Sequence, residues 1–323
     1  MKKNDKSIQP ISPNRSFPDL IARGVQYLKE EATNHSDLHS PTIGTLKYIP
    51  AGSFHIDYAK DTISIVSAFR MSETEITREQ FEKVMGYDPN DTENSTGQQD
   101  PVQYVSWYDT LVFCNKLSQL EGLTPVYSIN GSTDPVRWGE VPRWIDNKDY
   151  DPDDEDDEYY TISPDKDPWD AVTANWNANG YRLPTEMEWM WAAMGADKDN
   201  PGKVNKTGYN KEFSGSNASN DIGDYAWTDE NSNGTTHPVG TKQPNELGLY
   251  DMSGNVWEWC WDWYTDNYPT GPTTNYKGAA TGVERMARGG SWDDDASDAS
   301  VACCNYGLPY FRISDRGFRV VRP

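Results

Sequence analysis

The chain has 323 residues and a formal net charge of −22, and 13 Trp and 19 Tyr supply much of its apolar surface. Such acidity argues against nucleic acid and anionic membrane partners, which need a basic face, and no apolar run reaches the roughly 18 residues of a transmembrane helix. With 25 Gly and 21 Pro, the composition predicts one large or two ordinary domains built from loops and short strands rather than long helices.

Residues 1–43 predict a polar leader or tether that docks loosely on a main domain. They contain four prolines, and a short helical patch at 20–28 is their only apolar content. The first residues are basic but lack the apolar stretch of a signal peptide. We therefore expect either a cytoplasmic protein or one whose targeting segment is absent from this chain.

Ordered structure is expected to begin near Gly44. Residues 46–56 predict two short strands around a turn, and the partial alternation at 62–71 predicts a further strand. Helices are predicted by their N-capping patterns. The first follows the capping box at 77–80, the second follows Ser106, and the third begins at 184–188.

The segment 124–180 is expected to be a long irregular insertion. It contains an acidic run at 149–158, which lacks the glycine that an EF-hand calcium loop requires after its third ligand. We interpret the run as a solvated loop, with loose calcium binding as the alternative.

From residue 240 onward, Gly, Trp and turn residues predict short antiparallel strands joined by ordered loops. Tryptophan occupies every second position from 257 to 263, and a strand would send all four side chains to one face. We interpret them as core packing rather than a platform for stacking sugars.

Cysteine usage predicts neither a disulfide framework nor a zinc site. The chain has four cysteines, with no C-x-x-C pattern, and two of them are adjacent. The four are Cys114, Cys260, Cys303 and Cys304.

Four sequence blocks, in order along the chain, resemble the formylglycine-generating-enzyme (sulfatase-modifying factor) superfamily. The resemblance implies an α+β, C-type lectin-like fold of the formylglycine-generating-enzyme type, with short antiparallel strands, a few helices and many loops. It implies one domain over residues 44–323. The blocks are Pro101 to Leu117, Gly180 to Trp189, Asn245 to Trp259, and Arg288 to Trp292 with Gly317 to Val321.

The resemblance does not extend to the enzymatic cysteines. Members that oxidise a substrate cysteine to formylglycine carry cysteines two and seven residues after the Gly-Gly-Ser-Trp block. Asp294 and Ala299 occupy those positions here. Copper-dependent thiol chemistry needs soft thiolate ligands, so we expect neither this activity nor a redox cofactor.

A second enzymatic branch, the iron-dependent sulfoxide synthases, is similar over the same domain and uses histidines from an additional helical domain. His35 and His39 have the spacing of two ligands on one helix face, but the segment before the core is too short for that domain. We interpret both histidines as polar residues of the leader.

The C-terminal region, residues 288–323, resembles the variable proteins that diversity-generating retroelements rewrite at adenines, which share this fold and its Gly-Phe-Arg-Val-Val-Arg tail. Frame residues, expected to pack inward, are Ala296, Ala299, Val301, Ala302, Pro309, Arg312 and Arg316. The candidate variable, ligand-binding residues between them are Asp293, Asp294, Asp295, Ser297, Asp298, Asn305, Tyr306, Gly307, Leu308, Tyr310, Phe311, Ile313, Ser314 and Asp315. An ordinary irregular loop region is the alternative.

Such a surface would bind through aromatic anchors and adaptable polar groups. Tyr306, Tyr310 and Phe311 are the expected anchors, and the aspartates favour a cationic target. The expected partner is a protein or other surface ligand whose identity varies, and the expected protein is a monomer on the cell surface or outside the cell. A cytoplasmic location is the alternative.

The superfamily resemblance also implies a structural calcium ion. Its ligands would be the side chains of Asp251 and Glu258 and the carbonyls of Gly254 and Val256. Hard oxygen ligands suit calcium. The alternative is that the carboxylates cap backbone amides without a metal.

These observations predict a non-catalytic ligand-binding protein. The alternative is a related oxidoreductase that uses unrecognised residues, with Cys303 and Cys304 as the first candidates. A third reading is a structural or regulatory module without a ligand site.

Overall fold

The computed structural model describes four stretches of the chain: residues 35–59, 61–90, 92–146 and 160–323. The helical patch expected at 20–28 and the acidic run at 149–158 lie outside the described residues. Residues 36 to 323 form one compact unit.

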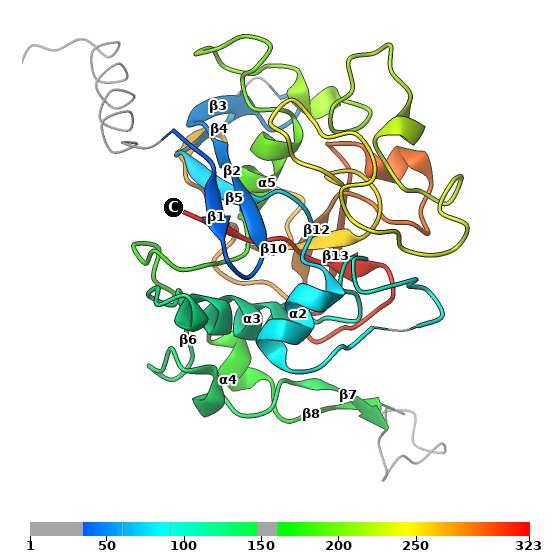
Figure 1. Cartoon of the computed structure of the whole chain (residues 1–323). Coiled ribbons are helices and arrows are strands. Elements are labelled where there is room, and N and C mark those ends of the chain that lie inside the picture. Colours follow the sequence, from blue (N-terminus) through cyan, green and yellow to red (C-terminus); the bar gives the residue numbers. More distant parts are fainter. Residues whose placement is uncertain (1–34, 60, 91, 147–159) are drawn as a thin grey trace, which may run out of the picture. The chain divides into compact units, whose positions relative to one another are not determined.

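Three sheets form the centre of this unit (Figure 1). The first has strand order β1-β2-β5-β15, the second β13-β12-β10-β14 and the third β11-β4-β3. In the second sheet β14 runs parallel to β10, and in the third β11 runs parallel to β4. The strands are β1 Leu38–Ser40, β2 Gly44–Ile49, β3 Gly52–His55, β4 Thr62–Val66, β5 Phe69–Ser72, β10 Trp257–Trp263, β11 Gly271–Thr274, β12 Arg285–Arg288, β13 Cys304–Gly307, β14 Arg316–Gly317 and β15 Val321–Arg322.

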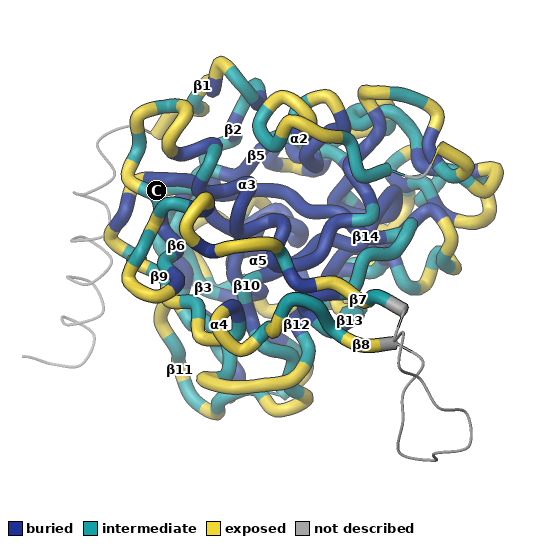
Figure 2. Tube along the Cα trace, turned by 90° about the horizontal axis from the view of Figure 1, so that it is seen from below, coloured by how far each residue is buried: buried dark blue, intermediate teal, exposed yellow. Residues whose placement is uncertain are grey.

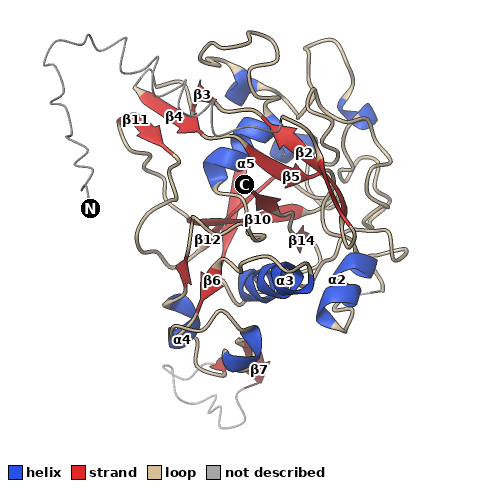
Figure 3. Ribbon diagram, turned by 60° about the vertical axis from the view of Figure 1, so that its left-hand side comes forward, coloured by secondary structure: helices blue, strands red, loops and turns tan. Residues whose placement is uncertain are grey.

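The three helices begin where their capping residues predict. Helix α2 (Arg78–Met85), α3 (Trp107–Leu120) and α5 (Glu186–Ala193) each have a complete capping box, with Thr77, Ser106 and Thr185 as N-caps. Each cap hydroxyl accepts a bond from the third helical residue, which satisfies one of the orphan amides of the first turn. Helices α2 and α3 pack against each other, and α5 contacts β10, β12 and β4 (Figure 3).

The core consists of two apolar clusters, one around α3 and the other around α5 (Figure 2). The tryptophans of β10 contribute as expected. Trp257 and Trp259 are buried, and half-buried Trp261 stacks on Tyr127 with ring centroids 5.2 Å apart. The register between β10 and β12 is irregular from Trp259 to Trp263.

The first sheet begins earlier in the chain than the sequence suggested. Leu38–Ser40 form β1 and pair with β2, so the sheet starts before Gly44. His39 therefore lies in a strand, where the helical spacing to His35 does not apply. The single strand expected at 62–71 is in fact two, β4 and β5, which belong to different sheets.

The insertion and the C-terminal region contain more regular structure than expected. Residues 296–299 form a short 3-10 helix, and β13 pairs with β12 among the predicted ligand-binding residues. The insertion elements are β6 Tyr127–Ser128, η1 Pro135–Arg137, β7 Arg143–Asp146, β8 Tyr160–Ser163, α4 Asp167–Asp170 and β9 Thr173–Ala174. No helix within the described stretches is long and apolar enough to cross a membrane.

Candidate ligand-binding site

The C-terminal region is held against the second sheet at both of its ends. The backbone amide of Trp292 donates to the carbonyl of Asn255 at 2.9 Å, and its indole Nε1 donates to the carbonyl of Ser314 at 3.1 Å. Trp292 is itself buried. The chain after β12 and the chain before β14 are therefore fixed to one scaffold, as a binding surface requires.

The predicted ligand-binding residues differ widely in exposure. Exposed residues are Asp293, Asp295, Ser297 and Tyr306. Half-buried residues are Asp294, Asp298, Asn305, Leu308, Phe311, Ile313, Ser314 and Asp315. Gly307 and Tyr310 are buried. Among the predicted frame residues, Ala302 is exposed rather than packed inward.

Tyr306 is the most accessible of the three expected anchors, with 44% of its surface exposed. Its ring stacks on that of Tyr264, with centroids 4.0 Å apart. We call these two rings the tyrosine pair; Tyr306 is its exposed member, and half-buried Tyr264 packs against the core around α5.

Tyr310 does not project outward as expected. It is 8% exposed and belongs to the core cluster around α3. Phe311 is partly covered because the ring of Trp144 on β7 lies 4.3 Å from its own, and Trp144 also lies 5.9 Å from Tyr310. The insertion therefore covers two of the three expected anchors.

Gly307 is closely packed, which limits the side chains that this predicted variable position can hold. A Cβ at this residue would lie 2.4 Å from Nη1 of Arg316 and 3.2 Å from the ring of Trp259. Arg316 is buried, and its guanidinium lies over the Trp259 ring at 4.6 Å. No larger side chain fits here unless this stack moves.

Asp294 occupies the first position at which the enzymatic relatives carry a cysteine, and its carboxylate is already engaged. Trp257 Nε1 donates to Oδ2 at 2.8 Å, and Ser291 Oγ donates to the same oxygen. The carbonyl of Asp294 accepts the amide of Asp229 at 3.1 Å. Asp294 therefore acts as a structural acceptor rather than a freely presented side chain.

Acidic side chains dominate the neighbourhood of Asp294. Burial first, and then the charges of Asp294 and Asp293, raise the pKa of Asp315 despite the opposing effect of Arg316. Exposed acids flank this cluster on both adjoining loops, and we call them the acidic patch. Its members are Asp229, Glu230, Asp293 and Asp295.

The two neighbouring cysteines do not form a reactive pair. Burial first, and then the carboxylate of Asp298, which the thiol contacts at 3.4 Å, raise the pKa of Cys303 to about 12. Burial also raises the pKa of Cys304. Because the thiolate is the nucleophile and the metal ligand, both thiols are poorly suited to redox chemistry near neutral pH.

The side chains expected to bind calcium lie in a buried charge network. Glu258 accepts hydrogen bonds from Arg319 Nε at 2.7 and 2.8 Å and from Trp189 Nε1 at 2.7 Å. Arg319 Nη2 also donates to the carbonyl of Asp251 at 3.2 Å. The Glu258 carboxylate is thus bound by side-chain donors, whereas Oδ2 of Asp251 accepts the backbone amide of Gly240 at 2.7 Å.

Negative charge nevertheless exceeds positive charge in this network. Glu75, Asp251 and Glu258 are buried around the single guanidinium of Arg319. Burial and the two other acids raise the pKa of Glu75 well above its ordinary value, and burial raises the pKa of Asp251 to about 6. Oδ1 of Asp251 is buried without a hydrogen-bond partner.

These properties fit an oxygen-ligated cation such as calcium. Across the described ranges, no three His, Cys, Asp or Glu side chains are grouped as a metal site. Main-chain oxygens would therefore have to supplement Asp251 and Glu258, and the carbonyls of Gly254 and Val256 are the candidates.

Sequence reasoning missed two aromatic residues that shape this surface, Tyr264 and Trp144. Tyr264 directly follows the alternating tryptophans, so its place just beyond the end of β10 was the available signal. Trp144 lies in an insertion of polar composition, and nothing local indicates which distant ring it covers.

Comparisons with known proteins agree with this architecture. A family model described as "Sulfatase-modifying factor enzyme 1-like domain" matches residues 33–323. The chain is 34% identical over 272 residues to chaperone protein LppX of Paenibacillus barcinonensis, covering 80% of this chain and 81% of that protein. It is 33% identical over 165 residues to the formylglycine-generating enzyme of Streptomyces coelicolor, covering 47% of this chain and 49% of the enzyme.

Among solved structures, Treponema denticola variable protein 1 is similar, with a TM-score of 0.70 and 33% sequence identity. The match covers 89% of this chain and 99% of that protein. The expected α+β fold of the formylglycine-generating-enzyme, C-type lectin-like type is confirmed, as is the expected likeness to a variable protein.

Proposed function

Because this chain belongs to the sulfatase-modifying factor enzyme 1-like domain family, we propose that it is a non-catalytic member that binds ligands through its C-terminal surface. The single observation that carries this proposal is the state of Asp294. A carboxylate stands where the enzymatic relatives carry a thiol, and Trp257 and Ser291 hold it in place. Thiol-based copper chemistry has no soft ligand at this position.

The ligand class that this surface supports best is a cationic polypeptide. The tyrosine pair offers aromatic faces that attract ammonium and guanidinium groups, and the acidic patch supplies long-range attraction. The Paenibacillus relative is named a chaperone, and the Treponema relative a variable protein. Both names are consistent with recognition of other molecules rather than with chemistry.

A binding measurement tests the proposal. The immobilised protein is exposed to poly-L-lysine and to poly-L-glutamate, with Tyr306→Ala and Asp295→Asn as variants. Tyr58→Ala is the matched control, because Tyr58 is 89% exposed and lies outside the C-terminal region. We expect salt-sensitive binding of poly-L-lysine that both variants weaken and the control retains. Equal binding by all four proteins would overturn the assigned surface.

We also propose that the exposed positions of this region are diversified by a retroelement and displayed outside the cell. Diversification would be confined to residues such as Asp293, Asp295, Ser297 and Tyr306, which are exposed. Sequencing the genomic neighbourhood of the codons for residues 285–323 tests this. A near-copy that differs at adenines beside a reverse transcriptase gene would support the proposal, and its absence would remove it.

The competing function is thiol oxidation at a site that sequence reasoning did not recognise. It is a candidate because a relative of this chain is named a formylglycine-generating enzyme. The raised pKa values of Cys303 and Cys304 argue against it. Oxidation of a cysteine-containing peptide with copper present, lost in Cys303→Ser or Cys304→Ser, would establish this function instead.

We also propose that the protein binds a structural calcium ion. Asp251 and Glu258, with main-chain oxygens, would hold it, and its charge would offset the excess of buried carboxylates. Its role would be to fix the loop before β10. Thermal unfolding with calcium and with a chelator tests this, and an unchanged melting temperature would exclude it.

A further inference from the structure

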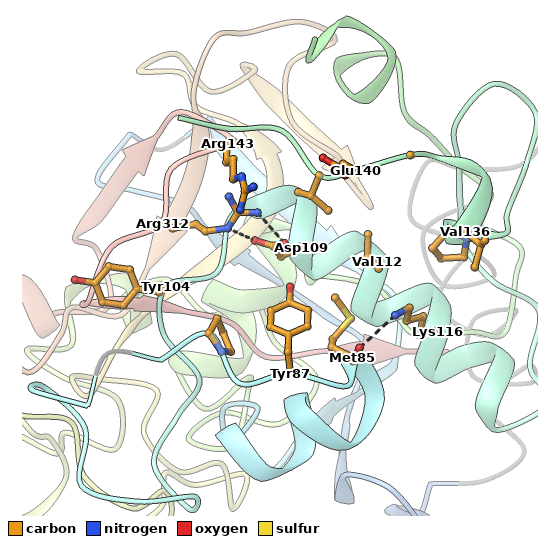
Figure 4. Close-up of a pocket in the computed structure, with 14 residues that line it drawn as sticks. Met85, Tyr87, Tyr104, Asp109, Val112, Lys116, Val136, Glu140, Arg143 and Arg312 are labelled. Atoms are coloured by element: carbon orange, nitrogen blue, oxygen red, sulfur yellow. Dashed lines mark hydrogen bonds and ion pairs between the residues drawn. The ribbon is translucent and has the colours of Figure 1, made fainter. Parts of the chain in front are cut away.

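A second cavity lies apart from the tyrosine pair and the acidic patch. Its volume is about 620 Å³, and it opens between helices α2 and α3, the insertion segment 135–143 and the end of the C-terminal region (Figure 4). Pockets for small molecules usually have volumes of about 300–1,000 Å³. The cavity therefore has room for a compact organic ligand.

One polar wall of this cavity is a fixed arginine. Arg312 donates Nε to Asp109 Oδ2 at 2.7 Å and Nη2 to Asp109 Oδ1 at 3.0 Å. Asp109 is 1% exposed and also accepts the backbone amide and the hydroxyl of Ser106 in the α3 capping box. This arrangement sets the plane of the guanidinium and leaves its Nη1 available to a ligand.

Further cations meet at the same cavity. Lys116, on α3, makes only a 3.5 Å contact with the carbonyl of Met85, so its ammonium retains donor capacity. Arg143 lies on the same side as Arg312 (Figure 4). Three cations thus face two acids, Asp109 and Glu140, in a protein whose net charge is −22. Since Arg312 neutralises Asp109, the remaining local charge is positive.

The middle of the lining is apolar. Met85 on α2 and Val112 on α3 lie between Asp109 and Lys116 (Figure 4), and Val141 of the insertion also lines the cavity. Val112 is almost fully buried, whereas Met85 and Val141 are half-buried. A ligand would therefore exchange water for cations at the Arg312 end of the cavity and for apolar contact along its middle.

We propose that this cavity binds an organic monocarboxylate with an apolar body. The carboxylate meets Arg312 Nη1 and Arg143, and the apolar body lies against Met85 and Val112, toward Lys116. Planar guanidinium groups suit carboxylates because they donate in a fixed fork. The cavity shares Arg312 with the C-terminal region, but this proposal does not depend on the ligand class given under Proposed function.

Displacement of a fluorescent anion tests the proposal. The probe is 8-anilinonaphthalene-1-sulfonate, an apolar anion whose emission rises when it leaves water. Octanoate and 1-octanol, which share a chain length but differ in charge, then compete for the site. We expect octanoate to displace the probe at concentrations at least about tenfold lower than octanol does. Octanol lacks the carboxylate and therefore loses a charged hydrogen bond to the cavity.

A variant assigns the binding to this cavity. Arg143→Met keeps an aliphatic stem and removes the charge beside Arg312, so it should weaken the binding of octanoate by about tenfold or more. Lys83→Met is the matched control, because this α2 lysine is exposed, bonds to the carbonyl of Pro41, and does not line the cavity. The proposal is overturned if octanol competes as well as octanoate. It is also overturned if wild-type protein binds neither probe nor octanoate, or if the Arg143→Met protein binds octanoate as wild type does.

Discussion

Asp251 provides the sharpest prediction because its pKa is about 6 in the folded protein, against an ordinary value of 3.8. The folded protein therefore holds this proton more tightly than the unfolded chain does. Stability from the protonated form is fully present below about pH 3.8 and is lost as the pH rises through 6. Asp251→Asn removes this dependence because an amide does not titrate.

The size of the effect follows from the two pKa values. A difference of roughly two units, at 1.36 kcal/mol per unit, amounts to ~3 kcal/mol of unfolding free energy between pH 4 and pH 8. The asparagine oxygen can still accept the 2.7 Å hydrogen bond from the amide of Gly240. A pH-independent difference in unfolding free energy between the wild type and Asp251→Asn cancels, because only the slopes of unfolding free energy against pH are compared.

Urea unfolding in the presence of a chelator, at intervals from pH 4 to pH 8, measures these slopes. We expect the wild-type protein to lose ~3 kcal/mol relative to Asp251→Asn over that range. Adding calcium at pH 8 should restore stability to the wild type and leave the variant unchanged. Parallel curves, within about 0.5 kcal/mol of each other, would refute the assignment of a charged, uncompensated Asp251.

Three further predictions concern buried contacts. Gly307→Ala should lower the unfolding free energy by about 1–3 kcal/mol, because its Cβ meets the Arg316 guanidinium, and denaturant unfolding measures this. Arg319→Met should lower the unfolding free energy by about 3–5 kcal/mol, because Glu258 would stay buried without its cation. A loss of less than about 1 kcal/mol would contradict the role of Arg319 as the cation of this pair. The Cys303 thiol, whose pKa is raised to about 12, should react with iodoacetamide far more slowly than free cysteine at pH 8, as mass spectrometry would show.

Local signals predicted the helices well, because a capping box is a short-range interaction that the sequence displays directly. Thr77, Ser106 and Thr185 each mark a helix start in both sequence and structure. The strands were harder to predict, since sheet membership depends on distant partners. Strand β4 pairs with β11 from residues 271–274, and nothing within 62–71 indicates that its two halves separate into different sheets.

In the candidate site, too, local features could be predicted from the sequence, whereas contacts with distant segments could not. The position of Asp294 after the Gly-Gly-Ser-Trp block was enough to argue against thiol chemistry, and the structure adds the two donors that hold it. The burial of Tyr310 and the constraint on Gly307 could not be predicted locally. One depends on Trp144 from the insertion, and the other on a cation stacked over Trp259.

Strand β15 couples the C-terminal region to the first sheet. It pairs with β5, and the carbonyl and amide of Val321 also bond to Arg182, so this sheet is complete only when segments far apart in the sequence have met. Contacts between such distant segments slow folding. The candidate binding residues, 293–315, lie between β12 and β15, so a substitution among them must still allow β15 to pair with β5.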